Sequence, residues 1–312
     1  MNEPILKFYD DSGYESALEF LSASDNHLVQ RKVNFPNPSQ ISLSNQKGCV
    51  IQRGIYLDTE TTGLSHNSDE VIQICMLPFI YAQDPVANRS TIVGVYPPYV
   101  GFKEPSMPLS QEIIDLTGIT MEMLEGQSLD IEKIEALLKK ADFIVAHNAA
   151  FDRPFTHGIS NLFAEKKWAC SFSDVPWRAL GFESLKLTHL AADLGFYFEP
   201  HQADKDCLAG LAVLAQMDES GESYFQKMIT AAEKDSITIR AEYAPFEAKD
   251  ILKYRGYSWQ DGSDGGTKGW ETSVAVDEAD DERQWLTSEV YNGRPKFSEK
   301  SKNALTRFTT SS

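Results

Sequence analysis

Three short acidic segments hold the residues of this chain whose types and spacing could do chemistry together. The first carries Asp58 and Glu60, the second Asp152, and the third His201 and Asp206. Magnesium prefers oxygen ligands and keeps several waters, so a few carboxylates and a substrate phosphate can hold it. Two such ions roughly 3.5 to 4 Å apart stabilise both the attacking and the leaving oxygen of an in-line displacement. Because a neutral imidazole can take a proton from water near neutral pH, the set indicates metal-dependent phosphodiester hydrolysis.

The predicted secondary structure can bring these segments to one place. Residues 50–57 are typical of a buried strand that ends at Asp58 and Glu60, and side chains two apart on a strand share a face. Residues 143–146 form a continuous apolar run, as in a strand buried on both faces, and Asp152 lies at the start of the next helix. A helix predicted over 203–217 carries Asp206 on its first turns, just after His201.

The other predicted elements complete one sheet and its helices. Strands are expected at residues 71–81 and 91–102, and near 168–170; helices are expected after Ser110 and at 121–124, 131–140 and 185–194. Three strands followed by alternating strands and helices predict a mixed α/β sheet. The first 48 residues form a segment of their own, with one amphipathic stretch before Pro36 and Pro38.

Composition limits what the acidic segments can belong to. The 312 residues, 42% of them apolar, can bury one good core and a second small one. A net charge of -17 argues against a protein that coats nucleic acid through a broad cationic face, but is compatible with an enzyme that grips a chain end. The four cysteines form no Cys-x-x-Cys pair, so reduced, buried thiols are expected. No signal-peptide or membrane-spanning pattern is visible, which favours a soluble cytoplasmic protein without membrane contact.

Taken together, the motifs resemble those of the DnaQ-like (DEDDh) 3′-to-5′ exonucleases, the family of the DNA polymerase III epsilon subunit. Thr-Thr-Gly follows the first acidic pair, Phe151 precedes Asp152, and a histidine stands at 201. The resemblance covers roughly residues 50–218. It implies a ribonuclease H-like fold with a mixed five-stranded sheet flanked by helices, and two divalent ions, Mg²⁺ or Mn²⁺, as cofactors. Taken alone, an Asp at a strand end is more often a turn residue or a helix cap.

The resemblance also implies roles for individual residues. Asp58, Glu60 and Asp206 would hold one metal, Asp58 and Asp152 the second, and His201 would be the general base. The backbone of Thr59 and the side chain of Leu64 would face the terminal nucleotide, although Leu64 could also be a loop anchor. Substrate contacts are further implied for Glu112, Thr117 and Phe151. Thr117 and Gln202 depart from the histidine and arginine that relatives have at these positions.

The remaining histidines have plainer interpretations. His147 precedes the second acidic segment and is interpreted as structural, because the general base of the family is the later histidine. His66, His157 and His189 belong to no motif, and surface exposure or core packing is expected for each.

Beyond the acidic segments the chain divides further. The predicted domains are an extension over 1–48, the exonuclease domain over 49–220, a helical connector with a small α+β module over 221–290, and a flexible basic tail over 291–312. The module has a strand at 236–242, a helix to Tyr254, a hairpin through Trp259 and Trp270, and a last helix near 280–290. Packing of both tryptophans in a small core is preferred over nucleic-acid or partner contact, because residues 241–290 are net acidic.

Three functions follow from the sequence. The favoured one is a metal-dependent exonuclease that releases 5′-monophosphates from single-stranded or frayed DNA 3′ ends, in repair or proofreading. The same chemistry on RNA is the alternative, since sugar discrimination depends on pocket geometry. A catalytically silent nucleic-acid-binding module is the third. A polymerase partner would be a separate chain, and residues 40–44 are similar to a sliding-clamp peptide that lacks its final aromatic, for which a chance match is the preferred interpretation.

Overall fold

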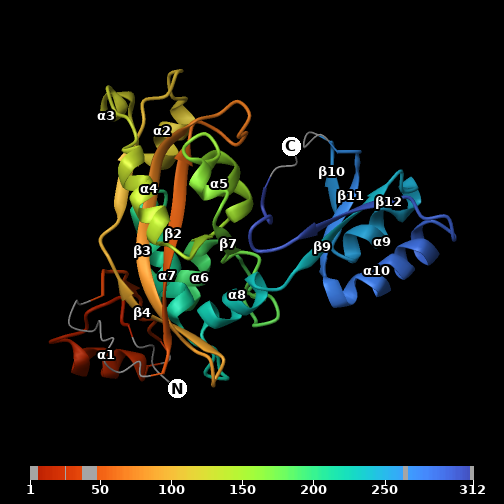
Figure 1. Ribbon diagram of the computed structural model, residues 1–312. Coiled ribbons are helices and arrows are strands. Elements are labelled where there is room, and N and C mark those ends of the chain that lie inside the picture. Colours follow the sequence, from red (N-terminus) through yellow and green to blue (C-terminus); the bar gives the residue numbers. More distant parts are fainter. Residues whose placement is uncertain (1–5, 25, 37–47, 263–265, 310–312) are drawn as a thin grey trace. The chain divides into compact units, whose positions relative to one another are not determined.

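The computed structural model describes residues 6–24, 26–36, 48–262 and 266–309 (Figure 1). They fall into two compact units, Met1–Ala231 and Ala232–Ser312. The division comes later than the predicted boundary at 220 because α8 (Tyr224–Ala232) packs on the first unit. The ring of Phe225 lies 5.8 Å from that of Phe79 and 5.1 Å from that of Tyr81. Residues 40–44 lie outside the described residues.

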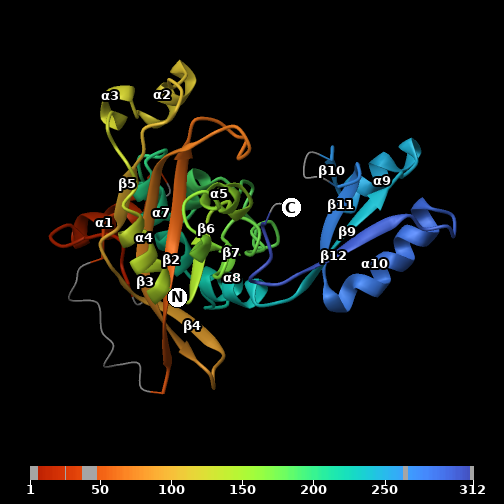
Figure 2. The ribbon, with the colours of Figure 1, turned by 45° about the horizontal axis from the view of Figure 1, so that its top comes forward.

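A mixed six-stranded sheet forms the centre of the first unit. Its order is β4-β3-β2-β6-β7, and β5 also pairs with β3. The strands are β2 (Val50–Thr61), β3 (Val71–Asp84), β4 (Arg89–Val95), β5 (Tyr99–Phe102), β6 (Phe143–Ala146) and β7 (Lys167–Cys170). β2 to β5 pair antiparallel, whereas β6 runs parallel to β2 and β7 parallel to β6 (Figure 2). The predicted mixed α/β architecture is confirmed.

The sheet has one strand more than the predicted five because residues 91–102 form two strands. Pro97 and Pro98 separate β4 from β5, and a proline has no N–H to donate to a neighbouring strand. β4 pairs with residues 79–84 of β3, and β5 with residues 73–76. The prolines therefore divide residues 91–102 into two strands, which pair with different parts of β3.

Helices cover this sheet, and α7 packs directly against β2 and β3. Ser110 caps the N-terminus of α2, as predicted, by accepting a hydrogen bond from Ile113 N at 3.3 Å. In chain order the helices are α1 (Glu15–Ser22), α2 (Gln111–Thr117), α3 (Met121–Leu124), α4 (Ile131–Lys140), α5 (Ala149–Thr156), α6 (Leu187–Asp193), α7 (Ala203–Ala215) and α8.

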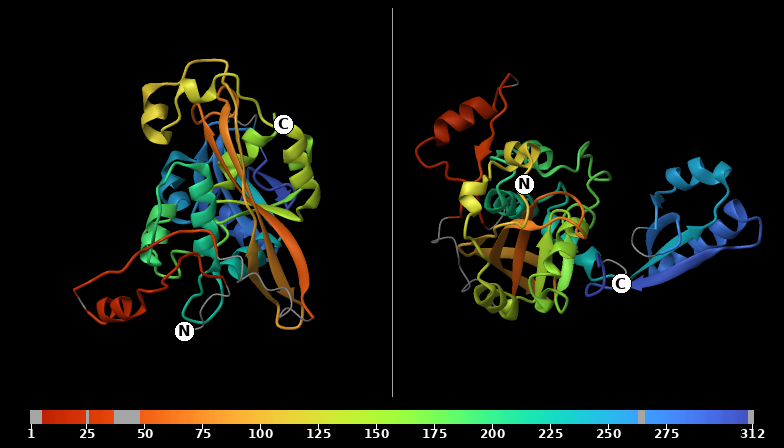
Figure 3. Two further views of the ribbon diagram at one scale, coloured as in Figure 1. Left: turned by 90° about the vertical axis from the view of Figure 1, so that its left-hand side faces the viewer. Right: turned by 90° about the horizontal axis from the view of Figure 1, so that it is seen from above.

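The described part of the N-terminal segment is built into the first unit. Leu6 and Phe8 are fully buried. β1 (Arg31–Lys32) pairs in parallel with β8 (Phe196–Tyr197), which adds a small second sheet. The helix α1 lies at the periphery and buries none of its residues (Figure 3).

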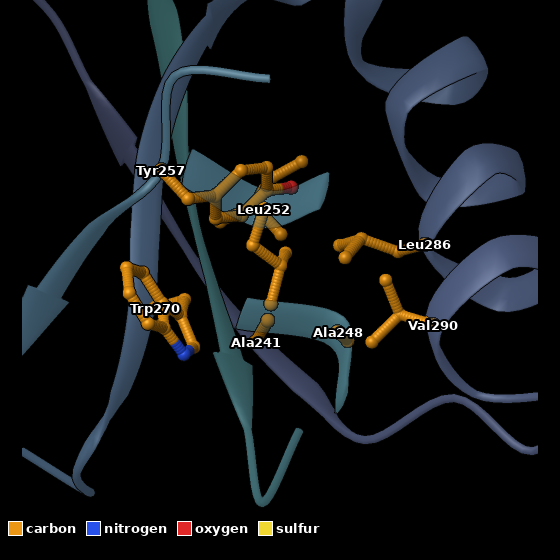
Figure 4. Packing of buried hydrophobic residues seen from close by; sticks show 8 residues of the cluster. Ala241, Ala248, Leu252, Tyr257, Trp270, Leu286 and Val290 are labelled. Atoms are coloured by element: carbon orange, nitrogen blue, oxygen red, sulfur yellow. The ribbon is translucent and has the colours of Figure 1, made fainter. Parts of the chain in front are cut away.

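The second unit is a four-stranded antiparallel sheet with helices on one face. Its order is β10-β11-β9-β12. The elements are β9 (Ser236–Glu242), α9 (Lys249–Tyr254), β10 (Ser258–Gln260), β11 (Gly269–Ala275), α10 (Ala279–Trp285), which continues as a wider turn over Leu286–Val290, and β12 (Phe297–Lys302). Leu252, Leu286 and Val290 from the helical side pack with Ala241 and Trp270 of the sheet (Figure 4).

Two expectations for this unit need correction. Residues 297–302, predicted to belong to a flexible tail, form β12 and pair with β9 along six residues. The polar sequence gives little strand signal by itself, and the strand exists because the edge of β9 offers it a partner. Of the two tryptophans expected in a small core, Trp270 is buried but Trp259 remains 54% exposed, with the centroids of the two rings 5.6 Å apart.

Two further findings concern the chain as a whole. Cys75, Cys170 and Cys207 are buried and Cys49 is partly buried, all with free thiols, as expected. In the part of the chain that the structure describes, none of the helices has the length and apolar character needed to cross a membrane.

The contact between α7 and β2 depends on Gly210. A Cβ built at this position would overlap the Tyr56 ring. A glycine in an open helix would gain stability of about 1 kcal/mol on replacement by alanine, but here we expect Gly210→Ala to lower the free energy of unfolding by about 1 to 3 kcal/mol. Urea unfolding checks this, with Gly158→Ala as a control, since a Cβ there meets nothing within 4 Å. Unchanged or higher stability of the Gly210 variant would contradict the steric argument.

Candidate active site

The end of β2 and the start of α7 bring three carboxylates together. Asp58, Glu60 and Asp206 each offer an oxygen such that these atoms all lie within 4.8 Å of one another. Asp58 and Glu60 share a face of β2, and the register shifts directly after Glu60, where the strand becomes irregular. The three side chains are partly buried. Residues almost 150 positions apart in sequence thus form one anionic site, as the acidic segments predicted.

Asp152 is held next to this group by Thr59. The Thr59 N–H and hydroxyl both donate to Asp152 Oδ1, at 3.1 and 2.8 Å. Asp152 is 3% exposed on the first turn of α5. Its charge is among those that raise the pKa of both Asp58 and Glu60, so all four carboxylates act on one another. The threonine hydroxyl is a positioning group that the sequence did not reveal, because the resemblance pointed to its backbone.

The start of α7 is fixed from two sides. Ala203 N–H donates to Oε1 of Gln73, at 3.4 Å, and Gln73 stands opposite Glu60 in the β2–β3 register. The backbone N–H groups of Gln202 and His201 donate to the Asp206 carboxylate, the former at 3.0 Å. The buried Gln73 therefore links β3, the strand paired with β2, to the helix that carries Asp206. No motif marked it in the sequence.

Burial raises the pKa of every carboxylate in the site, and the charges of neighbouring site carboxylates raise those of Asp58 and Glu60 further. Burial, then the charges of Asp152, Asp206 and Glu60, raise the pKa of Asp58 well above its usual range. Burial, followed by the charges of Asp206 and Asp152, raises the pKa of Glu60 to about 7. Burial raises the pKa of Asp152 to about 7 and that of Asp206 to about 6, against the hydrogen bonds that both accept. Four acids that resist ionisation in one place are a donor set that a divalent cation would stabilise.

These shifts predict how the metal-free protein responds to pH. Because the folded-state pKa values exceed those of the unfolded chain, the folded state binds more protons between about pH 4 and 7. The site therefore makes the free energy of unfolding fall as pH rises through this window. Thermal melts in EDTA at pH 5 and 7.5 should show a lower Tm at pH 7.5, with partial recovery on adding Mg²⁺.

The buried His147 changes the free energy of unfolding with pH in the opposite direction, so the experiment needs a control that retains it. Burial lowers the pKa of His147 to about 4, so this residue adds stability as pH rises. The contribution of the acidic site is isolated by subtracting the melts of Asp58→Asn, which keeps His147, from those of the parent. A pH-independent difference between the two proteins would rule out the buried carboxylates of the site as the cause.

His201, the expected general base, lies exposed in the residue pair just before α7. Its φ is +63°, a left-handed conformation uncommon for residues other than glycine. The backbone hydrogen bond to Asp206 explains how that conformation is held. The His201 imidazole therefore extends from a backbone segment that is hydrogen-bonded to Asp206.

The expected substrate contacts lie in different surroundings. Leu64 is 87% exposed in the turn after β2, and Glu112 is exposed in the first turn of α2. Phe151 is partly buried, with its ring 5.0 Å from that of Phe155. Thr117 is buried, donates to Ile113 O at 2.8 Å and accepts from Ile119 N at 3.1 Å, so its hydroxyl helps to end α2. Leu64, Glu112, Thr117 and Phe151 all remain predicted contacts.

The other histidines make local contacts. His147 bonds to Ser171 Oγ at 2.9 Å and to Leu185 O at 3.0 Å, and Ser171 Oγ also lies 3.0 Å from Tyr56 Oη. These contacts agree with its structural interpretation. His189 bonds to Ser184 Oγ at 2.7 Å, and His66 lies edge-on to Phe155. His157 is exposed.

Comparison with known families matches this site. The model of the RNase T family, described as "Exonuclease", matches residues 55–214, half of the chain. The chain belongs to this exonuclease family. The matched range contains all four carboxylates and His201, and the family expected from the acidic motifs is confirmed.

Relatives of this exonuclease domain are found within larger proteins. The DNA polymerase III PolC-type of Listeria monocytogenes is 31% identical over 151 residues, 46% of this chain and 9% of that protein. The same polymerase type from Mycoplasmopsis pulmonis is 29% identical over 215 residues, 64% of this chain and 14% of that protein. The chain therefore spans a small part of these relatives.

Solved structures also resemble the exonuclease domain. Exonuclease X in complex with 5′ overhanging duplex DNA has 20% identity and a TM-score of 0.42, covering 57% of this chain and 99% of that one. The zinc-bound E. coli ExoI–ssDNA complex has 16% identity and a TM-score of 0.48, and the match covers 82% of this chain and 66% of that one.

Proposed function

We propose that this protein removes nucleotides from DNA 3′ ends, in the 3′-to-5′ direction, as a metal-dependent exonuclease in repair or proofreading. The observation that supports this most is the approach of Asp58, Glu60 and Asp206 to within 4.8 Å in a chain of the exonuclease family. DNA is favoured as the substrate because the relatives include DNA polymerase III. A separate polymerase is the partner that this role would imply.

The residues divide the chemistry between them. Asp58, Glu60 and Asp206 would hold one divalent ion, and Asp58 with Asp152 a second. Mg²⁺ or Mn²⁺ bound there would activate the attacking water and stabilise the leaving oxygen. His201 takes the proton of that water, and Thr59 keeps Asp152 oriented through its two hydrogen bonds. Leu64, exposed in the turn after β2, would contact the terminal base.

Labelled oligonucleotides test direction, sugar and metal together. Single-stranded DNA and RNA of one sequence, each labelled at the 5′ end, are incubated with Mg²⁺, with Mn²⁺ and with EDTA. We expect a ladder of shortened DNA that keeps its label and mononucleotide 5′-monophosphates as products, with no change in EDTA. Release of the label as the first product would contradict the direction. Faster shortening of RNA would establish the exoribonuclease alternative instead.

A further inference from the structure

The sheet of the second unit has a helix-free face whose residues follow from strand alternation. Ile239 and Ala241 point to the core with α9 and α10, so Thr238 and Arg240 of β9 point the other way. Through the register, Lys300 and Lys302 of β12 and Glu271 of β11 share that second side. The hydrogen bonds from Arg240 to Glu271 and between Thr238 and Ser273 confirm the assignment. We call this side, with Arg307 beside it, the basic face.

Cations crowd together on this face. Arg240 is ion-paired with Glu271, with Nη2 2.6 Å from Oε2, and its Nη1 donates to Thr267 O at 3.1 Å. Lys300 and Lys302 stand two residues apart on β12, which places both on the same side. Arg307 is turned back toward the strand, since its N–H donates to Asn303 O at 2.9 Å. Burial, together with the charges of Lys300, Arg240 and Arg307, lowers the pKa of Lys302, against the effect of Glu271.

The helical side of the second unit carries charges of both signs, with Lys249, Lys253 and Arg255 among its basic residues. Acidic residues gather on the helical side, around α10: Asp277, Glu278, Asp280, Asp281, Glu282 and Glu289. On the helix-free side the described carboxylates are Glu242 and Glu271. Like charges held close together cost stability unless a counter-ion is present. Glu271 is that counter-ion for Arg240, which is only 9% exposed, so the cations that this face can offer to a ligand are Lys300, Lys302 and Arg307.

We propose that the basic face binds the phosphodiester backbone of single-stranded DNA and so holds the substrate outside the active site. Cations that neutralise phosphates release condensed counter-ions, which makes such binding favourable and dependent on salt. This rests on the proposed exonuclease function, since it supplies the same substrate with a second contact.

Binding of a fluorescent oligo-dT to the full chain tests the proposal. All proteins carry Asp58→Asn so that the oligonucleotide stays intact. We expect Lys300→Glu with Lys302→Glu to weaken binding about tenfold or more, and the slope of log K against log salt to become shallower by about 1.4, or 0.7 per contact. Lys249→Glu with Lys253→Glu, the same charge change on α9, should leave both values near those of the parent. A neutral pair, Lys300→Gln with Lys302→Gln, gives an intermediate loss and guards against misfolding of the charge-reversed pair.

A small substrate separates this inference from the exonuclease proposal. The p-nitrophenyl ester of thymidine 5′-monophosphate contains a single nucleotide and no further DNA backbone, so its hydrolysis reports the active site alone. With Asp58 present, the Lys300 and Lys302 variants should hydrolyse this ester at the parental rate but degrade long oligonucleotides more slowly. Unchanged DNA affinity and salt slope in both pairs would overturn the inference whether or not the ester is cleaved. If the parent cleaves neither substrate, the proposed function is wrong. The DNA affinities and salt slopes of the variants still decide whether the basic face binds DNA.

Discussion

Replacing Asp58 with asparagine is expected to lower metal-dependent hydrolysis of single-stranded DNA by about a thousand-fold, since a catalytic metal contributes several kcal/mol to transition-state stabilisation. The same change should raise the Tm of the metal-free protein at pH 7.5. The Asp58 carboxylate is disfavoured first by burial and then by the charges of Asp152, Asp206 and Glu60, and the neutral asparagine amide avoids both costs. Initial rates with Mg²⁺ and melting curves in EDTA measure the two effects on one preparation.

The two readouts together exclude a damaged fold as the cause of lost activity. A variant that loses activity because it misfolds melts at a lower temperature, whereas loss with a higher Tm assigns Asp58 to the reaction. Asp142→Asn is the matched control, since that exposed aspartate bonds to Arg53 N at 2.8 Å, outside the acidic group. Retention of activity by the Asp58 variant would remove the carboxylate from the proposed metal site.

Replacing His201 with asparagine is expected to lower the hydrolysis rate by about 100-fold or more, the usual contribution of general base catalysis. Asparagine is the better replacement, because it tolerates the left-handed conformation that His201 adopts at φ +63°. Alanine would combine loss of the imidazole with backbone strain next to Asp206. Rates at saturating DNA and Mg²⁺, across pH 6 to 9, measure the effect.

Metal binding distinguishes the base from a metal ligand. Titration of Mn²⁺ should give the His201→Asn variant nearly the affinity of the parent, whereas Asp58→Asn should bind much more weakly. His27→Asn changes another exposed histidine, which bonds to Ser24 Oγ. This variant should keep the hydrolysis rate and the Mn²⁺ affinity of the parent. A His201 variant with parental rates over the whole pH range would contradict the general-base assignment.

Local patterns predicted most elements, because each signal lay within the segment itself. Ser110 capped its helix as expected, and the apolar run at 143–146 became the buried strand β6. The errors arose where long-range pairing decided the outcome. Residues 297–302 carry a polar sequence, and their strand depends on β9, some 60 residues earlier in the chain. Strand propensity is a weak guide where pairing with the open edge of another strand determines the conformation.

The candidate site residues could be named from the sequence, but the contacts that hold them in place could not. The five motif residues could be named because their types and order are specific to a family. That Thr59 would hold Asp152, and that Gln73 would join β3 to α7, depends on side chains meeting across elements. The contact of Gly210 with Tyr56 is of the same kind. A sequence without its fold gives no signal for such pairs, since glutamine and glycine are common in many roles.

The pairing of β12 with β9 also sets an order of assembly. β9 begins at Ser236 and its outer partner ends at Lys302, so this edge of the sheet closes a longer stretch of chain than any other strand pair of the unit. During synthesis one edge of β9 therefore stays unpaired until β12 has left the ribosome. An open edge is a template for pairing with other chains. Removal of residues from 297 onward should then cause aggregation, visible by light scattering during refolding, rather than a simple loss of a tail.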